Sequence, residues 1–105
     1  MEVKTYAEYY LYSPHKRAKD FRNDTDYKTI LQLALSGPIK TIDVYQNTNA
    51  AEGKNERGRV IGTKLKNLVQ WGFLIKTGDM DPIYRQESFL LNERLRKEIR
   101  HLVEG

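Results

Sequence analysis

The chain has 105 residues, the size of a single domain, with a net charge of +4 and 39% hydrophobic residues. It contains no cysteine, which excludes a disulfide framework and thiolate metal sites, and no apolar run approaches the roughly 18 residues of a membrane span. The tyrosine-rich start lacks the features of a signal peptide, so we expect a cytoplasmic protein with no membrane partner.

The N-terminal region, residues 1–24, is predicted to be an arm or helix that is available for dimerisation. Residues 1–12 fit either a helix or a strand, and Ser13-Pro14 ends that element. Residues 15–22 are basic and form either a short helix or an extended arm. Four tyrosines lie close together before them, and three roles remain open: a dimer surface, a platform for stacking bases, or caps on the domain core.

The main domain, residues 25–105, begins with a predicted helix from Asp26 to Leu35, preceded by residues that favour a helix start. Ser36-Gly37-Pro38 ends this helix, and Ile39-Lys40 is expected to form a short strand. A second helix is predicted from Ile42 to about Asn47.

Thr41 is expected to cap the N-terminus of the second helix. The polar residues 47–55 are expected to form a turn, longer than the three or four residues of the tightest helix–turn–helix motifs.

A third helix is predicted to have two contrasting faces. Apolar residues at helical spacing mark the buried face, formed by Ile61, Leu65 and Leu68 and followed by Gly72 as the helix end. A second face repeats the same spacing without any acid, and it contains Arg59, Thr63, Lys66 and Gln70. Residues 51–72 contain five basic and two acidic residues, and therefore hold +3 of the chain's net charge of +4. This concentration of charge favours a polyanionic partner.

A β-hairpin is predicted after the third helix. Its strands are expected to run from Phe73 to Thr77 and from Ile83 to Leu91, with the tip at residues 78–82. Asn92 is then expected to cap a closing helix that buries Leu95, Ile99, Leu102 and Val103 and exposes Arg94, Arg96, Lys97 and Arg100.

This order of elements resembles the winged helix-turn-helix family of DNA-binding domains. The run Leu65-x-x-Leu68-x-x-x-Gly72-Phe73-Leu74, the hairpin after it and the FLLNERL entry to the last helix carry the resemblance, which covers roughly residues 26–103. It implies an α+β, mostly α, fold, with a three-helix core, a two- or three-stranded β-wing and a C-terminal helix.

The resemblance places the major-groove face on Arg57, Arg59, Thr63, Lys66, Asn67 and Gln70. Arginine can bind guanine and amides can match adenine, whereas lysine and threonine mostly hold phosphates. Two acids at the hairpin tip, Asp79 and Asp81, argue against insertion of the wing into a minor groove. With neighbouring cations and helix starts added, the predicted DNA-binding set is Lys40, Thr41, Lys54, Arg57, Arg59, Thr63, Lys64, Lys66, Asn67, Gln70, Lys76 and Arg85.

No catalytic or metal motif is complete. Residues 58–64 resemble a phosphate-binding loop but have the wrong length and order, and neither histidine belongs to a ligand motif. We therefore expect a non-enzyme without a cofactor or metal.

The expected function is transcriptional regulation by a homodimer that binds double-stranded DNA through the helix around residues 57–71, in the cytoplasm or at the nucleoid. Two alternatives remain. One is a winged-helix module for protein interaction in a transcription or replication assembly. The other is a binder of single-stranded nucleic acid through the tyrosines and the basic segment from Lys16 to Arg22.

Overall fold

Six helices and one β-hairpin make up most of the described chain, which comprises residues 6–47, 54–80, 82–83 and 87–104 of a computed structural model. For residues 45, 54–59 and 79 the backbone alone is described. The elements are α1 Tyr6–Tyr12, α2 Lys16–Asn23, α3 Thr25–Ser36, α4 Thr41–Asn47, α5 Lys54–Gln70, β1 Leu74–Met80, β2 Glu87–Leu91, the 3-10 helix η1 Glu93–Leu95 and α6 Arg96–Glu104. The fold is therefore α+β and mostly helical, as expected.

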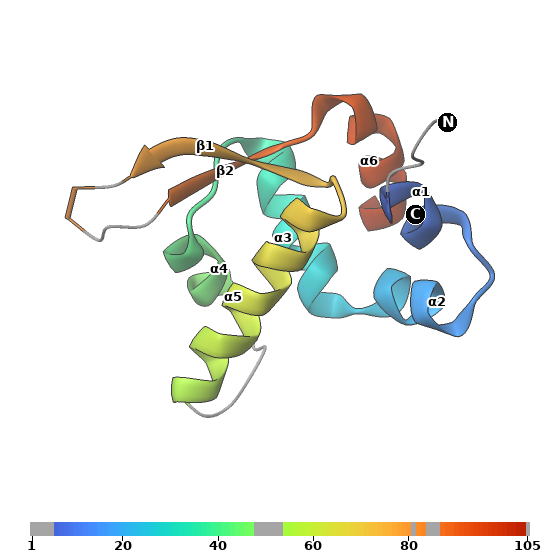
Figure 1. Ribbon diagram of the computed structural model, residues 1–105, viewed down its shortest axis with the longest axis horizontal. Coiled ribbons are helices and arrows are strands. Elements are labelled where there is room, and N and C mark those ends of the chain that lie inside the picture. Colours follow the sequence, from blue (N-terminus) through green and yellow to red (C-terminus); the bar gives the residue numbers. More distant parts are fainter. Residues whose placement is uncertain (1–5, 48–53, 81, 84–86, 105) are drawn as a thin grey trace.

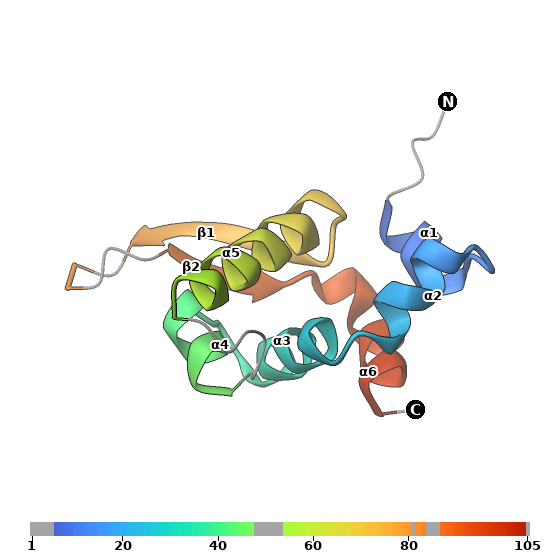
Figure 2. The same ribbon diagram turned by 90° about the horizontal axis from the view of Figure 1, so that it is seen from below.

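The hairpin points away from the helices α1, α2 and α6, which gather at the opposite end of the molecule (Figures 1 and 2). α5 runs between these two regions and leads directly into β1 (Figure 1). No helix of the described ranges is long and apolar enough to cross a bilayer.

Residues 6–24 belong to the same core as the rest of the chain. Of the two structures considered for residues 1–12, residues 6–12 adopt the helix, and residues 1–5 lie outside the described part. The Arg22 guanidinium donates to the carbonyls of Tyr10 at 2.8 Å and Ser13 at 2.7 Å, and so satisfies acceptors that the end of α1 leaves open. The buried side chains of these two helices, Ala7, Tyr10, Leu11, Ala18 and Phe21, lie in one cluster with those of α3, α5 and the hairpin.

α3 begins at a side-chain cap, because the Asp24 carboxylate accepts from the backbone N–H groups of Asp26 and Tyr27. The helix buries Tyr27, Ile30, Leu31 and Ala34. After it, the strand expected at Ile39-Lys40 is reduced to one bridge, in which Ile39 exchanges two backbone hydrogen bonds with Phe89 of β2 at 2.9 and 2.7 Å.

The N-terminus of α4 differs from the expected one by one residue. Thr41 is the first helical residue and not the residue before the helix. The backbone N–H of Lys40, which precedes it, donates to the Asp43 carboxylate at 2.8 Å, so Asp43 supplies the capping interaction. Of the predicted turn, residues 48–53 lie outside the described part, and α5 begins at Lys54.

α5 ends as its sequence predicts. Gly72 has a φ of +92°, a conformation that is cheap only for glycine. The Gly72 N–H bonds to the Val69 carbonyl and the Phe73 N–H to the Leu68 carbonyl, which is the hydrogen-bond pattern of a Schellman motif. Because Leu68 and Phe73 are both fully buried, the same turn seals the core and directs the chain into β1.

The hairpin is longer on its first strand than the sequence predicts. β1 continues through Gly78 to Met80, whereas a tip was expected from Gly78 onward. The regular register ends at the pair Lys76–Phe89 and resumes at Met80–Glu87, so the extra residues form an irregularity within the ladder. Gly78, with a φ of +82°, accommodates this bend, and its N–H donates to the Glu87 carboxylate. β2 is described only from Glu87, because residues 84–86 lie outside the described part.

The closing segment starts at Asn92 as expected, but its first turn is the 3-10 helix η1 and α6 begins only at Arg96. The Asn92 amide donates to the Gly72 carbonyl at 2.8 Å, which ties this start to the end of α5. Arg96, expected on the outside, is half-buried and donates to the Leu35 carbonyl and to Glu93. Ile99 is fully buried, whereas Leu95, Leu102 and Val103 are partly buried against the core.

Candidate nucleic-acid interface

One face of α5 is turned outward and carries polar side chains. Thr63, Lys66 and Gln70 are exposed, and none of their side chains has a hydrogen bond or ion pair within the described part of the chain. The opposite face buries Ile61 and Leu65. The helix is thus anchored from behind while three polar groups on its front remain free to contact a ligand. This is the separation of faces that the sequence predicts for this helix.

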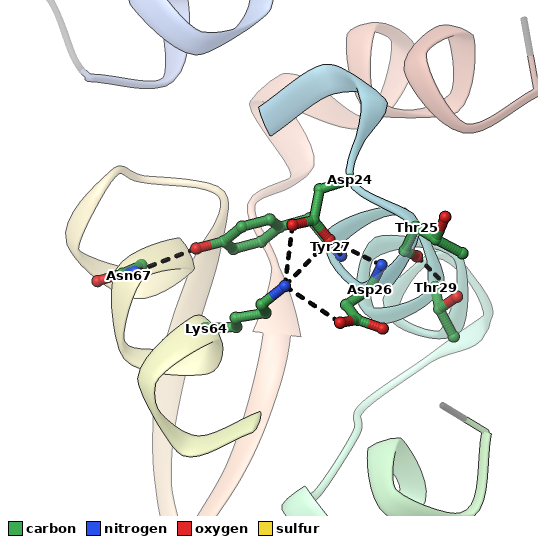
Figure 3. A network of polar contacts seen from close by, with 7 residues as sticks. All are labelled: Asp24, Thr25, Asp26, Tyr27, Thr29, Lys64 and Asn67. Carbon is green, nitrogen blue, oxygen red and sulfur yellow. Dashed lines mark hydrogen bonds and ion pairs between the residues drawn. The ribbon is translucent and has the colours of Figure 1, made fainter. Parts of the chain in front are cut away.

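Lys64 does not belong to that free surface, contrary to its predicted place among the DNA contacts. Its Nζ lies 2.9 Å from the Asp24 carboxylate and 3.1 Å from that of Asp26, and it sits 4.8 Å from the centre of the Tyr27 ring (Figure 3). Burial lowers the pKa of Lys64, but the hydrogen bonds to the two carboxylates outweigh it, and the pKa is raised overall. This ammonium group is therefore neutralised within the fold and links α5 to the start of α3.

Asn67 has a partly structural role. Its amide nitrogen donates to the Tyr27 hydroxyl at 3.1 Å, on the same side of α5 as Lys64 (Figure 3). The side chain is half-buried, and only this one hydrogen bond of the amide is found among the described residues. The carbonyl oxygen and the second N–H of the amide thus remain available at the edge of the exposed face.

The remaining predicted contacts divide into three groups. Lys76 of β1 is exposed, on the hairpin that follows α5. Lys40 and Thr41 are half-buried at the start of α4, and Lys40 makes further interactions within the protein. No side chain is described for the other four, which are Lys54, Arg57, Arg59 and Arg85. The first three of these belong to the N-terminal part of α5.

A second surface, formed with α1 and α2, lies beside α5. Tyr10 of α1 stacks on Trp71 at the end of α5, and this contact brings α1 and α2 next to the exposed face. Arg17 of α2 consequently lies in one hollow with Asn67 and Gln70. No short-range pattern signals such proximity, because it depends on how residues distant in sequence pack.

Comparison of the chain with protein families, with curated proteins and with solved structures found no match.

Proposed function

We propose that the chain is a winged helix-turn-helix protein that binds double-stranded DNA and regulates transcription. In this interpretation α3, α4 and α5 are the three core helices, and the hairpin is the wing. The Ile39–Phe89 bridge takes the place of the short third strand. The elements follow one another in the order that this family has, which supports the assignment.

The observation that carries the proposal is the free outward face of α5. The helix has 17 residues and is therefore about 25 Å long. An α-helix of this kind fits the major groove of B-DNA. Lys66 can neutralise a phosphate, and the Gln70 amide can offer a donor and an acceptor to an adenine edge. Both side chains are exposed and lack partners among the described residues, so they need not break an internal contact to bind.

Two further cations of the predicted set, Lys76 and Lys64, differ in whether they belong to this interface. Lys76 lies exposed on the wing and can contact the phosphate backbone beside the groove. Lys64 is left out of the proposed contact set because its charge is already neutralised by Asp24 and Asp26. We infer a homodimer, in which a two-fold axis would place the two reading helices roughly 34 Å apart on successive turns of DNA.

The test is a binding titration of the complete chain with random-sequence duplexes, followed by selection from a randomised duplex library. We expect the logarithm of the affinity to fall linearly with the logarithm of the salt concentration, by about 0.9 for each phosphate contact. Enrichment of one sequence in the selection would support specific regulation. Absence of salt-dependent duplex binding would contradict the proposal.

A second candidate function, protein interaction, is favoured by the outer face of the hairpin. Ile75 and Leu90 are cross-strand partners and both are exposed, by 50% and 40%, while Met80 and Ile83 near the tip are also exposed. Exposed apolar side chains that lie together often mark interaction surfaces. Light scattering tests this face: if it mediates self-association, Ile75→Ser lowers the molecular mass in solution without adding a charge beside Lys76.

A further inference from the structure

A groove lies between α1, α2 and the C-terminal end of α5, beside the proposed DNA-reading face. Its volume is about 500 Å³, within the roughly 300–1,000 Å³ that is usual for small-molecule sites. Three helices from distant parts of the sequence line it, with the side chains of Tyr6, Tyr9, Arg17, Asn67, Gln70 and Trp71. The proposed duplex contacts leave most of these residues without a role.

Aromatic rings form the apolar part of the groove. Tyr10 is almost fully buried and stacks on Trp71, so these two rings make a fixed base. Tyr9 packs edge-on against Tyr10, with ring centroids 5.0 Å apart. Tyr6 is 62% exposed and makes no ring contact within the described part of the chain. A planar ring that entered the groove would therefore find an unpaired aromatic surface on which to stack.

Arg17 is the one charged residue among the described residues that line the groove. Its guanidinium is exposed and has no ion pair or hydrogen bond among the described residues. No acid of the described residues lines this groove, whereas Asp20 and Asp24 line a neighbouring hollow that Arg17 also borders, and Asp24 is already paired with Lys64. The local charge therefore favours an anion, and the planar fork of arginine suits a phosphate oxygen pair.

Two amide groups complete the lining. Gln70 has no partner in the described chain, and Asn67 uses only one N–H, for Tyr27. Together they offer donors and acceptors near a stacking surface, a combination that suits the polar edge of a nucleobase. A ligand that used the stacking surface, the amide groups and the cation together would combine a planar heteroaromatic ring with an anionic group.

We propose that this groove binds a nucleotide unit, with its base against the tyrosines and its phosphate on Arg17. The unit can come from two sources, a free nucleoside monophosphate or an unpaired nucleotide in a single strand. The inference does not depend on duplex binding by α5, because Tyr6, Tyr9 and Arg17 lie on α1 and α2.

Trp71 is the single tryptophan of the chain and lines the groove, so its fluorescence reports directly on occupancy. We would titrate the complete protein with AMP, with adenosine, and with a short single-stranded oligoadenylate. AMP or the oligonucleotide should change the fluorescence saturably, whereas adenosine should bind about tenfold more weakly because it lacks the phosphate. Saturation by AMP identifies the free nucleotide as a sufficient ligand, and saturation by the oligonucleotide alone identifies a strand.

Two variants test the assigned contacts. Arg17→Gln should abolish the preference for AMP over adenosine. Tyr6→Leu should lower the affinity for both ligands several-fold, because it removes a stacking ring. Arg94→Gln, an exposed arginine outside the groove, is the matched control and should bind like the wild type.

The proposal is overturned if neither AMP nor the oligonucleotide gives a saturable signal, or if Arg17→Gln keeps the full preference for AMP. Duplex affinity of the Tyr6→Leu variant should equal that of the wild type. Failure of this site and failure of duplex binding are therefore separate results.

Discussion

The ring of Tyr10 in α1 stacks on the indole of Trp71 at the end of α5, with centroids 3.9 Å apart and planes inclined by 27°. Phe21 of α2 contacts both rings, at 5.2 Å from Tyr10 and 5.7 Å from Trp71. The N-terminal helices are thereby attached to the helix that we propose reads DNA. A change at Tyr10 should consequently affect the whole fold.

Tyr10→Ala should lower the free energy of unfolding by about 3 kcal/mol, because it removes a buried ring and leaves a cavity beside Trp71. Tyr10→Phe is the control. The Tyr10 hydroxyl makes no hydrogen bond in the described part of the chain, so this variant should stay within about 0.5 kcal/mol of the wild type. Urea unfolding followed by Trp71 fluorescence measures both values. A loss below about 1 kcal/mol for Tyr10→Ala would show that α1 is not part of the cooperative core.

Two glycines of the α5 region, Gly62 and Gly72, should respond to alanine in opposite directions. Gly62 lies within the helix, and a Cβ built there meets no atom within 4 Å. Gly62→Ala should therefore raise the free energy of unfolding by about 0.5–1 kcal/mol, because it reduces the freedom of the unfolded chain. Gly72, with a φ of +92°, should show the reverse, and Gly72→Ala should cost about 1–2 kcal/mol. Thermal and urea unfolding of the two single variants provide the comparison, and equal signs would contradict the assigned end of α5.

The Lys64 ion pairs predict a loss of stability at alkaline pH. The folded state holds the pKa of Lys64 above its ordinary value, so folding favours the protonated form. The corresponding stabilisation is complete below the unfolded pKa of about 10.4 and disappears as the pH rises through the folded value. Burial also raises the pKa of the Tyr10 phenol, with Arg17 opposing it, and this acts in the same direction.

Lys64→Met isolates the lysine contribution, because Tyr10 is unchanged in both proteins. The variant should be about 1–2 kcal/mol less stable than the wild type at about pH 8. The difference should shrink toward zero at about pH 12. Urea unfolding across this range gives the measurement, and a difference that is independent of pH would mean that the ion pairs do not stabilise the fold.

Most element positions followed from local sequence signals. The apolar spacing of α5 and the conformational freedom of Gly72 correctly predicted a helix that ends at the entry to β1. Asn92 was correctly expected to cap the last segment. These features depend on interactions between residues a few positions apart, which a sequence pattern records directly.

Two of the errors involve residues that meet across long distances in the sequence. Lys64 was predicted to be a DNA contact because it belongs to a basic helix, but Asp24 and Asp26 bind it at the start of α3. Arg96 was expected outside, but it reaches the Leu35 carbonyl. The length of β1 was underestimated because Gly78 permits a bend within the ladder as well as a turn. In each case a tertiary partner or a bulge determines where the residue lies, and the local periodicity of the sequence records neither of them.

The central claim is that the outward face of α5 contacts duplex DNA. It is tested most directly by the salt dependence of duplex affinity in the Lys66→Ala and Gln70→Ala variants, measured by fluorescence anisotropy beside Lys97→Ala, which removes an exposed lysine on α6. We expect Lys66→Ala to weaken binding to all duplexes and to reduce the salt slope by about 1, and Gln70→Ala to reduce discrimination between sequences, while Lys97→Ala behaves as the wild type. Unchanged affinity and slope in the Lys66→Ala, Gln70→Ala double variant would contradict the claim.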